Sequence, residues 1–194
     1  MDDTPIEINW IGPFRWPGFE NGSTSFPDFP GIYLWTAEYV HGGYLIYAAG
    51  ITRRPMKKRF REHTHAYLNG IYTLFDVDAM KQGIRKEIWH GFWTKKRSEE
   101  KQREYERRKS ELEAVAQTQL ATFRVFTAMV DTKPRFLERL EAAIMNSLYN
   151  QPAPFSGIPD RGMMLAPCWQ SETPIFIQNY SSAVLHGLPE RMVI

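Results

Sequence analysis

The chain has 194 residues, of which 43% are hydrophobic, 14% aromatic and 24% charged. This length predicts one domain, and the aromatic content is too high for a mostly disordered chain. Its single cysteine, Cys168, excludes an internal disulfide and a zinc site built from several cysteines. The start, Met1-Asp2-Asp3, lacks the basic residues of a secretory signal, and no apolar stretch approaches the length of a membrane span. We therefore expect a soluble, cytoplasmic protein without a membrane partner.

The formal net charge of +2 is unevenly distributed along the chain. Residues 1–52 contain one basic and six acidic residues, a net charge of −5. Residues 53–113 contain 17 basic and 10 acidic residues, a net charge of +7. A local positive excess is typical of surfaces that bind a polyanion such as nucleic acid, although an ordinary solvated surface gives the same pattern.

The first half of the chain predicts β-structure followed by a helix. A short strand over 6–11 leads into an arm rich in proline and glycine, whose aromatic side chains are expected to pack on the domain. Two β-rich runs, 31–36 and 44–51, are separated by a segment containing Gly-Gly and indicate an antiparallel hairpin. A helix is expected from Pro55 to about Leu68, because proline is favoured in the first turn of a helix.

The second half predicts two further helices and two strands. Residues 95–120 alternate charges without glycine or proline, which indicates a long, largely solvated helix that contacts phosphates or forms a dimer. A strand is expected over 123–130. A helix over 132–149 is expected to be capped by Asp131 or Thr132, with Pro134 in its first turn. The last strand candidate covers 174–178.

The order of several short motifs along the chain is informative. They are Gly31-Ile32-Tyr33, the stretch from Tyr47 to Thr52, the stretch from Arg59 to His63, the stretch from Glu141 to Ile144, and Asn150. In this order and spacing they resemble the GIY-YIG nuclease superfamily, over about residues 30–69 and 123–150. The resemblance implies an α+β fold with a small three-stranded antiparallel sheet flanked by helices. The remaining segments of this single domain are then an N-terminal arm (1–29), a helical insertion (70–122) and a C-terminal extension (151–194).

The resemblance also implies hydrolysis of phosphodiester bonds with one Mg²⁺ or Mn²⁺ ion. Tyr33 would orient or deprotonate the attacking water, and Arg59 would hold the phosphate with its fixed fork of donors. His63, one turn from Arg59, would contact the phosphate or partner the tyrosine. Glu141 would bind the metal. Helix geometry favours Glu141 over Glu138, because Glu141 borders the apolar face of its helix and Glu138 points away from it.

One position departs from the family pattern. The second motif usually has tyrosine two residues before its glycine, but Ala48 stands there and Tyr47 comes one residue earlier. In a regular strand this shift turns the side chain to the other face. A β-bulge could turn Tyr47 back, or Tyr44 or Lys57 could replace it, or activity could be reduced; we favour the bulge.

The expected partner is double-stranded DNA. Arg53, Arg54, Lys57 and Lys58 are candidate phosphate contacts. Asn150 matches a family asparagine that supports the site or contacts the nucleic-acid backbone, or it is only a helix cap. The internal insertion resembles the restriction-endonuclease branch of the superfamily, in which a homodimer is one expected assembly. The alternatives are a non-catalytic or weakly active DNA-binding module, which the missing tyrosine at Ala48 suggests, and an RNA-directed nuclease.

Overall fold

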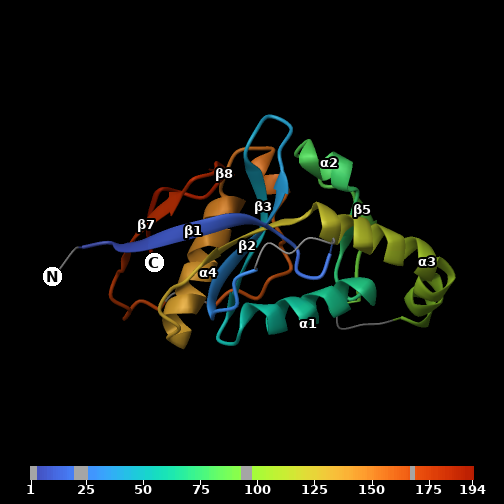
Figure 1. Ribbon diagram of the computed structural model, residues 1–194, viewed down its shortest axis with the longest axis horizontal. Helices are drawn as coiled ribbons and strands as arrows, with labels where there is room; N and C mark the ends of the chain where they lie inside the picture. The colour runs from blue at the N-terminus through green and yellow to red at the C-terminus, as the bar shows by residue number, and fades with distance from the viewer. Residues whose placement is uncertain (1–3, 20–25, 93–97, 167–168) are drawn as a thin grey trace.

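A seven-stranded mixed sheet is the centre of the fold (Figure 1). The computed structural model describes residues 4–19, 26–92, 98–166 and 169–194, so Cys168 and the start of the charged run at 95–97 lie outside the described part. The strands of this sheet, in spatial order, are β8 (Leu185–His186), β3 (Tyr44–Thr52), β2 (Gly31–Glu38), β6 (Arg124–Ala128), β1 (Ile6–Arg15), β7 (Phe176–Ser181) and β9 (Arg191–Val193).

The expected small three-stranded antiparallel sheet is therefore wrong. The three expected strands β3, β2 and β6 are adjacent and antiparallel, but both terminal regions extend them. β1 pairs antiparallel with β6, β7 pairs parallel with β1, and β8 pairs parallel with β3. These pairings join residues up to about 170 positions apart, as in Ile6 opposite Ile177. No local sequence pattern predicts such a pairing, because each strand is visible only as its own alternation of apolar and polar residues.

The expected hairpin is confirmed, and its alternation divides the core into two faces. In β2, Tyr33 and Trp35 point to one face of the sheet, whereas Ile32 and Leu34 point to the other. Both faces are covered by helices, which explains why nearly all of β2 is buried.

Two helices cover the face that carries Tyr33, and a third covers the opposite face (Figure 1). The first two are α1 (Met56–Leu68) and α3 (Glu99–Thr122), and the third is α4 (Pro134–Tyr149). The helix expected from Pro55 is thus confirmed as α1, which ends at Asn69 and Gly70, the latter with a φ of +64°. The cap expected for α4 is wrong, since its N-cap is Lys133.

The insertion contains more than the long charged helix. It adds a short helix, α2 (Val77–Lys81), and a separate two-stranded sheet of β4 (Leu74–Phe75) and β5 (Glu87–Trp89). The alternating charges of α3 form the i,i+4 ion pairs Glu99–Arg103 and Glu104–Arg108. However, α3 is not fully solvated, because Leu112, Ala116 and Leu120 bury one stripe of it in the core.

The N-terminal arm packs on the domain through its aromatic side chains, as expected. Trp16 is 1% exposed, and its ring lies 4.8 Å from that of Phe60 on α1. Its indole Nε1 donates to Thr64 Oγ1 at 2.8 Å. The arm therefore fixes α1 against the sheet. No helix in the described part of the chain has the length and apolarity to span a membrane.

Candidate active site

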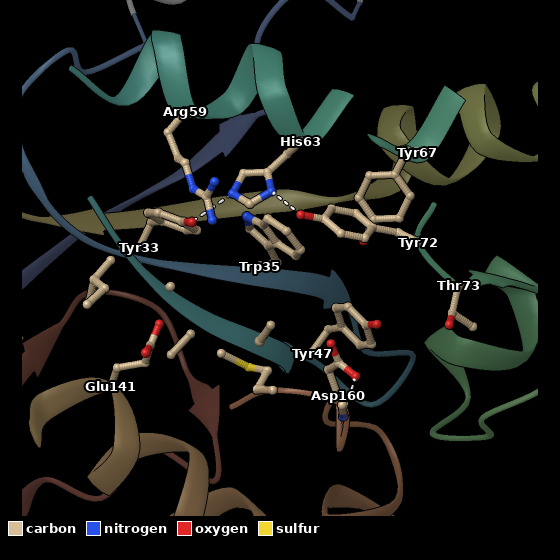
Figure 2. A pocket seen from close by; sticks show the side chains of 16 residues that line it. Tyr33, Trp35, Tyr47, Arg59, His63, Tyr67, Tyr72, Thr73, Glu141 and Asp160 are labelled. Atoms are coloured by element: carbon tan, nitrogen blue, oxygen red, sulfur yellow. Dashed lines mark hydrogen bonds between the residues drawn. The ribbon is translucent and has the colours of Figure 1, made fainter. Parts of the chain in front are cut away.

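A cavity of about 390 Å³ lies at the free edge of β3, between α1 and α4. β8 pairs only with Tyr44 and Leu45, so the rest of this edge of β3 has no strand partner within the described residues. Side chains from the two opposite faces of the sheet can therefore meet around the edge. Tyr33 and Arg59 reach the cavity from the α1 side, and Glu141 reaches it from α4 (Figure 2).

The β-bulge that the sequence suggested is present at Tyr47. Trp35 pairs with Ala48 whereas the next residue, Thr36, pairs with Ile46, so Tyr47 is the extra residue of β3. As a result both Tyr47 and Ala48 point to the face of the sheet that carries Trp35. The rings of Tyr47 and Trp35 are almost parallel, with centroids 6.4 Å apart. The bulge brings Tyr47 into the cavity, but its hydroxyl lies at the end away from Tyr33 (Figure 2).

Tyr33, His63 and Tyr72 form a chain of hydrogen bonds. The Tyr33 hydroxyl lies 2.8 Å from His63 Nε2, and His63 Nδ1 lies 3.1 Å from the Tyr72 hydroxyl (Figure 2). Burial, helped by the positive charge of Arg59, lowers the pKa of His63 well below its ordinary value, so the ring is neutral at pH 7. A neutral imidazole donates through one nitrogen and accepts through the other. One tyrosine hydroxyl therefore donates to His63 and the other accepts from it.

Gly50 is needed for the position of Tyr33. A Cβ atom at residue 50 would lie 2.5 Å from the ring and from the hydroxyl oxygen of Tyr33. This contact is shorter than any side chain tolerates, so the tyrosine can lie across β3 only where that strand has glycine. Burial raises the pKa of Tyr33 above its ordinary value, while the neighbouring Arg59 guanidinium opposes the rise.

Arg59 is held on α1 by a shared carboxylate. Glu62 accepts from Arg59 at 3.2 Å and binds Arg54 through two bonds of 2.8 Å. These bonds lower the pKa of Glu62, with Arg54 contributing most. The Arg59 guanidinium points into the cavity beside the hydroxyl of Tyr33 (Figure 2). It keeps donors available there for an anion.

Glu141 is a partly buried carboxyl without an ion pair among the described residues. Burial raises its pKa to about 7, while the charge of Arg59 opposes the rise. Glu138 lies one turn earlier on the helix and differs from Glu141. It forms an ion pair with Arg53 at 3.3 Å and lies outside the cavity. The preference for Glu141 over Glu138 thus agrees with the placement of the two side chains.

The far end of the cavity is formed by residues that the sequence analysis did not select. Tyr67, Tyr72 and Thr73 line it from α1 and the start of the insertion, and Asp160 lines it from the C-terminal extension (Figure 2). Trp35, between the two ends, could have been found, because it follows Tyr33 by two residues and so shares its face of the strand. Asp160 carries no such signal, since only tertiary structure brings its loop to this place.

The remaining predicted residues lie outside this cavity. Arg53 and Arg54 line a shallow groove beside it, which also includes Arg59. Lys57 and Lys58 are exposed on α1, and no ion pair to either is formed by the residues that the structure describes. Asn150 ends α4 and borders a different cavity, so the structure does not bring it to the others.

The charged end of the cavity fits a Mg²⁺ ion that is shared with a phosphate. Over the described ranges, no three His, Cys, Asp or Glu side chains come together as a metal site. Mg²⁺ is usually bound by only one or two carboxylates, with waters and substrate phosphates completing its ligands. Glu141 is compatible with this need, because its carboxyl forms no ion pair with the described residues and lines the same cavity as the guanidinium of Arg59.

Comparisons with protein-family models, with curated protein sequences and with solved structures found nothing that matches this chain.

Proposed function

We propose that this protein is a Mg²⁺-dependent endonuclease that hydrolyses phosphodiester bonds in double-stranded DNA. The observation that carries the proposal is the meeting of Tyr33, Arg59, His63 and Glu141 in one cavity, although they come from a strand and two separate helices. These groups supply a water-orienting phenol, a phosphate clamp and a carboxylate for a hard cation. Phosphodiester hydrolysis needs a positioned water, charge relief on the phosphate and stabilisation of the leaving group, and these groups can fill those roles.

The hydrogen bond from Tyr33 to His63 supports a route for the proton of the attacking water. With Nδ1–H donating to Tyr72, His63 Nε2 accepts the hydroxyl proton of Tyr33. The Tyr33 oxygen then has its lone pairs directed at the cavity. As the water oxygen bonds to phosphorus, the phenol oxygen takes a water proton and passes its own to His63 Nε2. Because burial and Arg59 lower the pKa of His63, the ring then gives a proton up to solvent. The bond from phosphorus to the leaving sugar oxygen breaks, and that oxygen takes a proton from solvent.

Arg59 and Glu141 would act on the phosphate from opposite sides. The Arg59 guanidinium would hold its non-bridging oxygens and offset the growing negative charge. Glu141 would hold the Mg²⁺, which when bound polarises the phosphate and stabilises the leaving oxygen. The exposed cations beside the cavity, Arg53, Arg54, Lys57 and Lys58, would contact flanking phosphates and so position the duplex without reading its sequence.

A plasmid-nicking assay tests this function. Supercoiled plasmid is incubated with the protein and either Mg²⁺ or EDTA, and relaxed and linear forms are measured. Cleavage that requires Mg²⁺ and is lost in Glu141→Ala is the expected result. Binding of the plasmid without any cleavage would support the alternative, a non-catalytic DNA-binding module. Preferential cleavage of duplex RNA in a competition assay would show that the substrate is RNA and not DNA.

A further inference from the structure

The cavity is larger than the chemistry of the proposed nuclease requires. The charged end consists of Tyr33, Arg59, His63 and Glu141. The aromatic end extends beyond Trp35 to Tyr47, Tyr67 and Asp160 (Figure 2). Its volume of about 390 Å³ lies within the range of about 300–1,000 Å³ that is typical of small-molecule sites. A single phosphate and a metal ion would leave the aromatic end empty.

We propose that the aromatic end binds a nucleobase that is turned out of the duplex, next to the phosphate held by Arg59, and that Asp160 selects guanine. This proposal rests on the proposed function for its substrate. Enzymes that must reach one nucleotide often turn its base into a pocket built from aromatic walls and a few polar groups. The occupant is therefore a part of the same DNA strand that is cleaved.

The dimensions of the cavity support one nucleotide. The Tyr33 and Trp35 ring centroids are 5.9 Å apart, and those of Trp35 and Tyr47 are 6.4 Å apart. The two ends are thus separated by two ring spacings along the same face of the sheet. A nucleotide whose phosphate lies at Arg59 would extend its base along this face toward Tyr47.

Two residues that line the cavity each carry a buried donor without an acceptor among the described residues. The indole Nε1 of Trp35, a residue only 7% exposed, has no hydrogen-bond partner among the residues that the structure describes. The buried hydroxyl of Tyr67 has none either, although the Gln119 side chain is close enough to lower the pKa of that hydroxyl, which burial raises. A buried donor without a partner is unfavourable, because it has lost its hydrogen bonds to water. Acceptor atoms of a bound nucleotide would remove that cost.

Asp160 is held as a fixed acceptor at the aromatic end. Its backbone N–H donates to the Tyr47 carbonyl at 2.8 Å, and its carbonyl accepts from the Tyr149 hydroxyl at 2.6 Å. Its Oδ1 accepts from the Gly162 N–H at 2.9 Å. The other oxygen, Oδ2, has no donor within the described part of the chain. The loop therefore positions one carboxylate oxygen for a donor that the protein does not supply.

Guanine matches this acceptor best among the four bases, because adenine and cytosine each offer one amino group beside a ring nitrogen that only accepts. Its N1–H and N2–H₂ groups are adjacent donors that can both reach one carboxylate oxygen. Thymine offers only N3–H between two carbonyl oxygens, which a carboxylate repels. Guanine also has the acceptors O6 and N7, which suit the unpaired hydroxyl and indole donors.

Binding of mononucleotides tests the pocket without requiring cleavage. The affinities of dGMP, dAMP, dCMP, dTMP and deoxyribose 5-phosphate are measured by isothermal titration calorimetry. We expect dGMP to bind about tenfold more tightly than dTMP or deoxyribose 5-phosphate, because a hydrogen bond to a charged group contributes that much. Equal affinities for dGMP and deoxyribose 5-phosphate would overturn the proposal.

The Asp160→Asn substitution tests the role of the carboxylate. Asparagine keeps one oxygen for Gly162 and replaces the other with an N–H₂ donor, so the tenfold preference for dGMP over dTMP should vanish or reverse. Glu111→Gln, an exposed carboxylate on α3, is the matched control and should leave the preference unchanged. A preference that survives Asp160→Asn would contradict the assignment, and circular dichroism shows whether the variant folds.

Sequencing of cleaved plasmid ends separates this proposal from the proposed function. Guanine is expected at a fixed position beside the cut, and the enrichment should disappear in Asp160→Asn. Cleavage without any enrichment of guanine would contradict the proposed base pocket but still support the proposed nuclease activity. Selective binding of dGMP without cleavage would support the pocket and remove the nuclease.

Discussion

The two ends of the cavity differ in how their residues are supplied. The charged end is formed by Tyr33, Arg59, His63 and Glu141, all of which lie within recognisable motifs. The aromatic end depends on a bulge at Tyr47, on the insertion, and on Asp160 in the C-terminal extension. In the proposed function the charged end supplies the groups for hydrolysis, and in the proposed base pocket the aromatic end selects the substrate. Chemistry and selectivity are therefore expected to respond to different substitutions.

The largest effect is expected from Glu141→Ala. Because this carboxylate is the proposed metal ligand at the charged end, its removal should lower plasmid cleavage by more than about 10³-fold. Plasmid binding in a gel-shift assay should remain within about twofold. Glu138→Ala is the matched control, since it removes a carboxylate one turn away that forms an exposed ion pair with Arg53. Equal losses in the two variants would contradict the assignment of the metal ligand.

Arg59→Ala should reduce the cleavage rate by about 10²–10³-fold, because preorganised donors to a developing charge contribute about 2.7–4 kcal/mol. Arg59→Lys should recover only part of the rate, since lysine lacks the planar fork. Arg61→Ala removes an exposed arginine from the same helix and should have little effect. If Asp160→Asn reduced the cleavage rate as much as Arg59→Ala, the assignment of chemistry to the charged end and of selectivity to the aromatic end would be contradicted.

The pKa of Glu141 predicts a pH-dependent gain in stability for Glu141→Gln. In the folded protein burial raises this pKa from 4.5 to about 7. The folded state therefore binds the proton more tightly than the unfolded state, and wild-type stability falls as pH rises from about 4.5 through 7. At pH 8 the variant should be more stable by about 1–3 kcal/mol, and the difference should vanish near pH 4.

Urea unfolding at pH 4 and pH 8 measures this difference. Addition of Mg²⁺ at pH 8 should stabilise the wild type and not Glu141→Gln, because a bound cation stabilises the charged carboxylate. A variant that is less stable than the wild type at pH 8 would show that the charged carboxylate already has a stabilising partner in the protein.

The smallest effect on cleavage is expected from Tyr72→Phe, at the junction of the two ends. Loss of the hydroxyl removes the group that fixes the tautomer of His63, so kcat should fall about fivefold to tenfold with KM unchanged. Tyr72 is a positioning residue, and a rise in KM alone would assign it to substrate binding. Tyr180→Phe, a change at an exposed tyrosine far along the chain, is the control.

The sequence by itself determined the central hairpin, the main helices and the four residues that form the charged end. Alternation in the hairpin placed Tyr33 on one face of a strand, and helical spacing placed Arg59 and His63 on one flank of α1. The one-residue shift at Tyr47 even indicated a bulge, because only an extra residue restores the side chain to that face. These features depend on interactions between residues that are a few positions apart, so a local sequence pattern can predict them.

Only the tertiary structure decided the extent of the sheet and the composition of the aromatic end. The parallel pairing of β1 with β7 and the position of Asp160 beside Tyr47 join segments that are separated by most of the chain. The free edge of β3 likewise depends on how little of it β8 covers. Such contacts arise from the packing of whole elements around the core. The residues that form them show no sequence periodicity from which their partners could be predicted.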